Sequence, residues 1–138
     1  MSPLRIQGER KRLERLFKNR YNFDPTKGYA KVSVVSSGKK KLYVLEATFD
    51  NNYPFSMPTL YLSYPKGLRD HHGQLLSNKG LSHSYHTLGA KDGKINLCYQ
   101  AKSWNSHNSL ADVFTKGKMY TEALELHQKT GKPISHYL

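Results

Sequence analysis

The stretches AKVSVVS (residues 30–36) and KLYVLEATF (residues 41–49), joined by SGKK (residues 37–40), decide the fold class of this chain. Both stretches are rich in β-branched and aromatic residues, which favour strands. A short polar segment with a glycine between two such runs predicts a β-hairpin. A third strand is expected at TLYLSY (residues 59–64), which lies between two prolines. Together these segments predict an antiparallel meander.

The connection DNNYPFSMP (residues 50–58) holds two prolines and two aromatic residues. Because proline restricts the backbone, we expect a rigid turn with Tyr53 and Phe55 folded back onto the sheet. From Pro65 to Gly93 no periodic pattern persists, so we expect a long irregular segment there.

A helix is expected to start at Ser109, because Ser109 and Asp112 form a capping-box pattern. An apolar stripe follows over residues 110–126, Gly117 is a candidate for a break in this helical region, and GKP (residues 131–133) ends it. An N-terminal helix, a meander, an irregular region and C-terminal helices predict an α+β domain.

Composition places limits on the class of protein. With 138 residues and 37% hydrophobic content, we expect one core and one domain, residues 1–138. The single cysteine cannot form an internal disulfide, and the chain shows neither a signal peptide nor an apolar stretch of membrane-spanning length. We therefore expect a reducing, cytoplasmic setting, without a membrane partner and without a cofactor.

The formal net charge of +12 suggests an acidic partner. Near the N-terminus, Leu13, Leu16 and Phe17 recur at helical spacing and leave basic residues on the other faces. These basic residues form either a partner-docking surface or a solvated helix face. The docking candidates are Arg10, Lys11, Arg12 and Arg15.

Cys98 is the only cysteine and ends the segment GKINLC (residues 93–98). Ile95 and Leu97 alternate with polar residues as in a short strand, and polar residues follow, so Cys98 lies where a strand runs into a loop. A lone cysteine is either a small buried hydrophobic residue or a reactive thiol. The loop position favours a reactive thiol, because loops on rigid scaffolds carry many functional residues.

Four features in order resemble the ubiquitin-conjugating enzymes. YPFSMP (residues 53–58) resembles the Tyr-Pro-Phe-x-x-Pro turn of that family, and residues 93–98 are similar to its Gly-x-Ile-Cys-Leu active site, with two extra residues before the cysteine. Trp104 and Leu110 stand where the family has a tryptophan and a helix. The resemblance extends from the N-terminal helix to about residue 114. It implies a ubiquitin-conjugating-enzyme-like fold and a transferase that carries an acyl group as a thioester on Cys98.

Residues 120–132 are similar to the tails of bacterial conjugating-enzyme-like proteins. Several of these are encoded in antiphage operons beside a cyclic-oligonucleotide synthase, which is a nucleotidyltransferase. The resemblance therefore implies a protein donor whose free C-terminus joins Cys98 and is then transferred, with such a synthase as the candidate partner. One branch works without a separate activating enzyme. We favour that branch because nothing suggests an appended activating domain, and an activating enzyme stays open as a partner.

HTL (residues 86–88) stands where the family has His-Pro-Asn. His86 matches the family's histidine, which braces the active-site loop, whereas the asparagine that stabilises the oxyanion has no clear counterpart. Polar side chains close in sequence could stabilise the oxyanion or orient the acceptor, or lie in surface loops. These candidates are Asn96, Asn105, His107 and Asn108. Positive charge at Lys94 or Lys102 would increase the ionised fraction of the thiol.

Three other functions are compatible with these residue types. Zinc binding would use His71, His72, His83, His86 and Cys98, but no second compact ligand pair accompanies His83 and His86, so we expect no metal site. A Cys-His hydrolase is neither supported nor excluded. The main alternative is a non-catalytic basic binding module for nucleic acid or an acidic protein, because 22 lysines and arginines accompany ten tyrosines.

Overall fold

The computed structural model describes residues 1–99 and 103–138. Two α-helices flank a series of strands along the chain. The elements are α1 (Pro3–Phe17), β1 (Tyr21–Asp24), β2 (Tyr29–Val35), β3 (Leu42–Thr48), β4 (Thr59–Tyr64), the 3-10 helix η1 (Leu76–Asn78), β5 (Leu81–Ser82), β6 (Thr87–Lys91), β7 (Lys94–Leu97), α2 (Leu110–Thr130) and the 3-10 helix η3 (Ile134–Tyr137).

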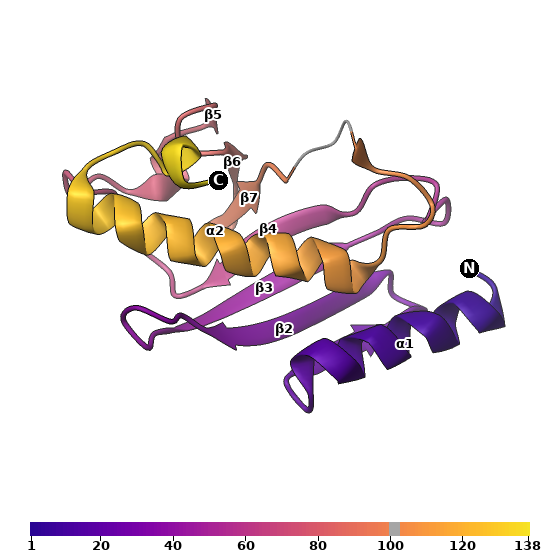
Figure 1. Ribbon diagram of the computed structural model, residues 1–138. Coiled ribbons are helices and arrows are strands. Elements are labelled where there is room, and N and C mark those ends of the chain that lie inside the picture. The colour runs from indigo at the N-terminus through magenta and orange to yellow at the C-terminus, as the bar shows by residue number, and fades with distance from the viewer. Residues whose placement is uncertain (100–102) are drawn as a thin grey trace.

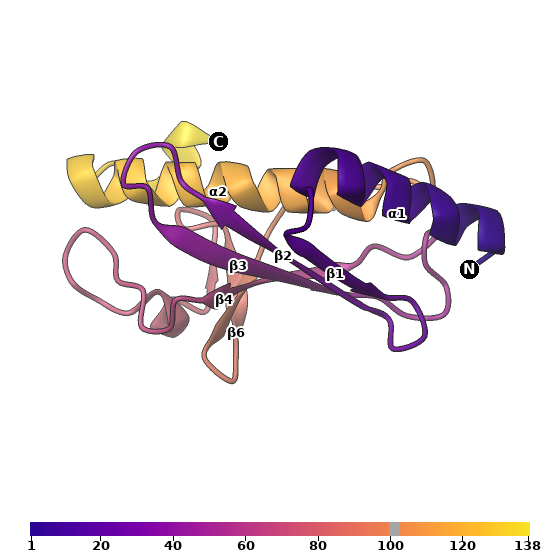
Figure 2. The same ribbon diagram turned by 90° about the horizontal axis from the view of Figure 1, so that it is seen from below.

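The seven described strands form one antiparallel sheet in the order β1-β2-β3-β4-β7-β6-β5. Both α-helices lie against one face of this sheet (Figures 1 and 2). The buried apolar side chains form one core cluster between the two layers. This arrangement confirms the predicted α+β class, with an N-terminal helix, an antiparallel sheet and a C-terminal helix.

The predicted hairpin is confirmed, with β2 and β3 paired from Tyr29↔Thr48 to Val35↔Leu42. The third predicted strand is β4, which pairs with β3. Alternation explains the hydrophobic pattern: in β2, Val32 and Val34 are buried in the core, whereas Val35 is exposed.

The segment between Pro65 and Gly93 is more regular than expected. It contains η1, β5 and β6, and β6 pairs with β7 on the side of β7 away from β4. β1 was likewise not predicted from the sequence. These strands are two to five residues long, which is too short for a period-two pattern to stand out.

Gly117 does not break the C-terminal helix, and α2 runs without interruption through it. The helix begins after Ser109 with the predicted capping box, and Gly131 ends it with a φ of 81°. A Cβ atom at position 117 would lie 2.8 Å from Cδ1 of Leu45, so this glycine lets α2 approach β3 closely. Because α2 is continuous, the C-terminal helical region is one α-helix, and the short η3 beyond Gly131 was not predicted.

Two apolar residues lie elsewhere than predicted. Tyr53 packs into the core at 2% exposure, but Phe55 in the same turn is 80% exposed. On α1, Leu13 and Phe17 are buried, whereas Leu16 is 52% exposed. Leu16 is exposed because the buried side of α1 follows Glu9, Leu13 and Phe17, which are spaced four residues apart. No helix in residues 1–99 or 103–138 is long and apolar enough to cross a lipid bilayer.

Candidate functional site

Cys98 follows β7 directly and lies beside His86, which directly precedes β6. The β6–β7 pairing brings Thr87 opposite Leu97, and the Cys98 amide donates a 2.9 Å hydrogen bond to the His86 carbonyl. The fold therefore brings together the two residues that the sequence predicted as catalytic. Cys98 is partly buried.

His86 holds this position through its backbone. Its φ of 51° is in the left-handed region, and its amide donates to the carbonyl of His83 at 3.3 Å. The imidazole lies against the His83 ring, with 5.6 Å between the ring centroids. The hydrogen bond that links His86 to Cys98 therefore uses the backbone carbonyl oxygen of His86 and not its imidazole.

A groove of about 420 Å³ begins at Tyr99, immediately after Cys98, and runs along α2. Its described lining consists of Tyr99, Ser103, Trp104, Asn108, Asp112, Val113, Thr115, Lys116 and Met119. The Tyr99 hydroxyl donates to the Pro58 carbonyl, and burial raises the pKa of Tyr99. The groove was not predicted, although its described lining residues all lie between Tyr99 and Met119 in the sequence.

Among the described residues, neither the Asn96 nor the Lys94 side chain has a hydrogen bond to Cys98. Asn96 lies in β7 opposite Tyr61, between two buried residues, so its side chain is on the sheet face away from the core. Lys94 forms an ion pair with Glu46, 3.1 Å from Nζ to Oε1. Lys102 lies outside the described residues.

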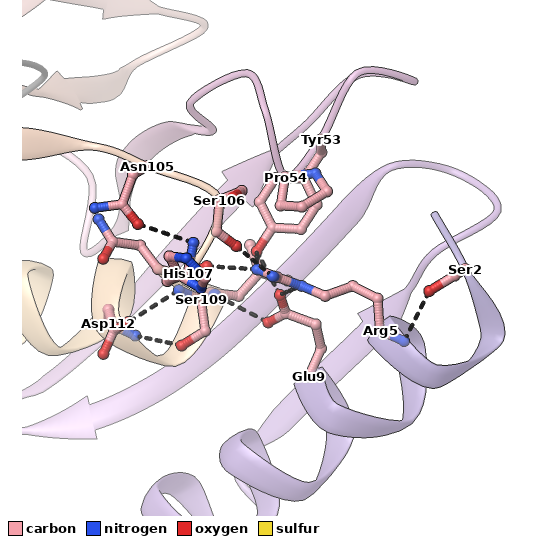
Figure 3. A network of polar contacts seen from close by, with 12 residues as sticks. Ser2, Arg5, Glu9, Tyr53, Pro54, Asn105, Ser106, His107, Ser109 and Asp112 are labelled. Atoms are coloured by element: carbon pink, nitrogen blue, oxygen red, sulfur yellow. Dashed lines mark hydrogen bonds and ion pairs between the residues drawn. The ribbon is translucent and has the colours of Figure 1, made fainter.

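Asn105 and His107 form a tight turn that is fixed to α1 (Figure 3). The Asn105 side-chain oxygen accepts a 2.9 Å hydrogen bond from the His107 amide, and both side chains are exposed. Arg5 of α1 donates to the carbonyl oxygens of Ser106, at 2.5 Å, and of Asn108. Of the predicted site residues, His86 is the one with a described hydrogen bond to Cys98.

Glu9 anchors this loop and is fully buried (Figure 3). Its Oε1 atom accepts the Leu110 amide at 3.0 Å, and its Oε2 atom accepts the Tyr53 hydroxyl at 2.6 Å and Arg5 Nε at 2.8 Å. Burial and the Glu9 charge raise the pKa of Tyr53, so its hydroxyl stays a donor. Glu9 was not predicted as a buried residue from the sequence, although its position four residues before Leu13 is the available signal.

The four predicted docking residues, Arg10, Lys11, Arg12 and Arg15, are all exposed. They do not share one contact: the Arg10 guanidinium lies 5.0 Å from the centroid of the Phe23 ring, whereas Arg15 lines a groove between α1 and α2. The remaining cations of that groove, Lys18, Arg20 and Lys118, were not predicted as docking residues.

Five of the seven histidines form two separate groups. His71 lies against both His72 and His127 at the end of α2, whereas His83 lies against His86, which is hydrogen-bonded to Cys98. His127 is buried, accepts the His71 amide at Nε2 and has Nδ1 2.6 Å from the Lys132 carbonyl oxygen. In the part of the chain that the structure describes, no three potential ligands gather to hold a metal ion.

Comparisons with family models, with curated proteins and with solved structures gave no match to this chain.

Proposed function

We propose that this protein is a ubiquitin-conjugating-like transferase that carries the C-terminus of a protein donor as a thioester on Cys98. The observation that carries the proposal is the 2.9 Å hydrogen bond from the Cys98 amide to the His86 carbonyl. It fixes the only cysteine at the end of a central strand, beside the one histidine that matches the family pattern.

The proposed fold is that of the ubiquitin-conjugating enzymes, and two contacts support it. The resemblance used a tyrosine-proline turn and a tryptophan that are about 50 residues apart. In the structure the Trp104 indole donates to the Pro54 carbonyl at 3.0 Å, and its ring lies 6.0 Å from that of Tyr53. Two motifs of the resemblance thus form one contact, as expected if they belong to one conserved arrangement rather than to chance matches.

The chemistry requires a thiolate, a donor with an activated carboxyl carbon, and room for the chain end. The thiolate of Cys98 attacks the acyl carbon of an activated donor, either an acyl adenylate or a thioester on another protein, and expels AMP or a thiolate. An acceptor amine then attacks the Cys98 thioester, loses a proton and expels the Cys98 thiolate. The groove lined by Tyr99 and residues of α2 does not have Cys98 among its described lining residues, but it begins one residue after Cys98 in the chain, and we place the C-terminal segment of the donor there. We propose a cyclic-oligonucleotide synthase of an antiphage operon as the protein donor, and a cytoplasmic setting for the reaction.

Intact-mass analysis after co-expression with the proteins encoded beside this gene tests the proposal. Wild type should gain the mass of a protein donor less one water, and dithiothreitol should release it. Cys98→Ala should show no adduct, and Cys98→Ser should retain an oxyester that resists dithiothreitol. His86→Asn tolerates the left-handed backbone and should still form the adduct, because the brace is a backbone carbonyl.

The competing function is a basic binding module without catalysis, which the net charge of +12 favours. If wild type forms no thiol-sensitive adduct with any neighbouring protein, while Cys98→Ala binds partners as tightly as wild type, the transferase proposal is wrong. If wild type forms the adduct and Cys98→Ala does not, the protein is not a purely non-catalytic binding module.

A further inference from the structure

The groove between α1 and α2, which we call the basic groove, is lined by Arg15, Leu16, Phe17, Lys18, Arg20, Ser33, Val34, Val35, Thr115 and Lys118. Its volume is about 530 Å³. Four of these residues are cationic, and no aspartate or glutamate is among them. The groove therefore has a single sign of charge, which favours an anionic ligand.

The four cations are free to bind a ligand. Arg15, Lys18 and Arg20 are exposed and Lys118 is partly buried. In residues 1–99 and 103–138 the ion pairs are Arg5–Glu9, Lys79–Asp70 and Lys94–Glu46, and none of them involves a cation of the basic groove.

Apolar surface lies between these charges. Leu16 is 52% exposed. The Val35 side chain, by alternation with buried Val34, lies on the sheet face away from the two helices. Val35 is also the last residue of β2, beyond the point where β1 pairs, since β1 begins opposite Val32. Ser36 donates to Lys41 and Ser33 donates to Arg20, so by alternation the backbone groups of Val35 point to the unpaired edge.

We propose that the basic groove binds an acidic amphipathic segment of a protein partner, with carboxylates on the four cations and an aliphatic side chain on Leu16. Nucleic acid fits less well, because single-strand binding relies on exposed aromatic rings for base stacking. Phe17 is the one aromatic residue in the described lining, and it is 8% exposed. This proposal does not depend on thioester chemistry at Cys98.

Fluorescence polarisation tests the proposal with a labelled peptide in which leucines are interspersed among glutamates. The peptide should bind wild type and weaken as NaCl rises. Reversing one cation on each wall, Arg15→Glu with Lys118→Glu, should weaken binding about tenfold, because each attraction becomes a repulsion. The matched control, Lys27→Glu with Lys91→Glu, makes the same change in net charge at exposed sites elsewhere and should stay within about twofold of wild type.

Leu16→Ser tests the apolar contact, and it should weaken the leucine-containing peptide but not an all-glutamate peptide. Urea unfolding of each variant confirms that the fold is retained, and amide shift changes on peptide addition should map to the basic groove. The proposal is wrong if the control pair weakens peptide binding as much as the groove pair does. It is also wrong if wild type binds the all-glutamate peptide as tightly as the leucine-containing peptide, or if single-stranded DNA binds the same residues more tightly than the peptide does.

Discussion

A single buried carboxylate joins three parts of the chain. Both oxygens of Glu9 accept hydrogen bonds, from the Leu110 amide at the start of α2, from Tyr53 in the turn and from Arg5 on α1. Because all three partners are donors, the site suits a carboxylate and does not suit a side chain with its own N–H groups.

Glu9→Gln should therefore lower the free energy of unfolding by about 2–3 kcal/mol, since the new amide group meets a donor and the Arg5 charge loses its partner. Urea unfolding at neutral pH measures the change. Glu14→Gln on the exposed side of the same helix is the control and should change stability by less than about 0.5 kcal/mol. Equal effects of the two substitutions would mean that the buried network does not stabilise the fold.

Among the helices, two glycines differ in the space that a side chain would find. A Cβ atom on Gly117 of α2 would lie 2.8 Å from Leu45 Cδ1, whereas on Gly8 of α1 the nearest atom would be Arg12 Nη1 at 3.7 Å. Gly8→Ala should therefore stabilise the protein by up to about 1 kcal/mol through helix propensity alone.

Gly117→Ala gains the same propensity but must push α2 away from β3, and overpacking typically costs about 1–3 kcal/mol. We expect this variant to be less stable than wild type, while Gly8→Ala is more stable. Thermal and urea unfolding of both variants measure the difference. A stabilising Gly117→Ala would show that Leu45 repacks freely and that close approach is not why glycine stands there.

The elements differ in how far the sequence predicts them. The hairpin of β2 and β3 and the capping box at Ser109 were predictable, because their signals lie within a few neighbouring residues. β1, β5 and β6 were not, because they are short and gain their hydrogen bonds from partners that are distant in sequence. Gly117 was misjudged for the same reason: its role depends on Leu45, which is 72 positions away in the chain.

In the candidate site, too, local signals were predictable and long-range contacts were not. Cys98 and His86 were predicted from local motifs, and the β6–β7 pairing brings them together. Asn96, Asn105 and His107 were chosen only because they are close in sequence. Backbone direction then places Asn96 on the open sheet face and Asn105 in a turn tied to α1.

At the scale of the whole molecule, the charge balance makes the fold sensitive to acid. Ten carboxylate residues face 22 lysines and arginines, so protonating carboxylates increases an already large positive charge. Burial alone would raise the pKa of both Glu46 and Glu125. Hydrogen bonds, led by Tyr29 for Glu46 and by Ser36 for Glu125, outweigh burial and lower both pKa values.

Asp70 is the strongest case. Burial raises its pKa, but hydrogen bonds from Lys79, the Gln74 amide and Tyr85 outweigh burial and hold this pKa far below its ordinary value. The Lys79 ammonium lies 2.6 Å from Oδ2. Because the folded-state pKa lies below that of the unfolded chain, the unfolded state binds more protons in acid. The stabilisation is therefore complete above about pH 5 and decreases as the pH falls through and below the ordinary range near 4.

Asp70→Asn should lower the free energy of unfolding at pH 7 by about 2 kcal/mol, because the Lys79 charge loses its partner. The same variant should lose less stability than wild type between pH 7 and about pH 3, since it lacks this titrating group. Urea unfolding across this pH range measures both effects. Asp92→Asn, in the exposed turn between β6 and β7, should keep the wild-type pH dependence. If Asp70→Asn keeps it as well, the acid sensitivity arises from the other carboxylates and the overall charge.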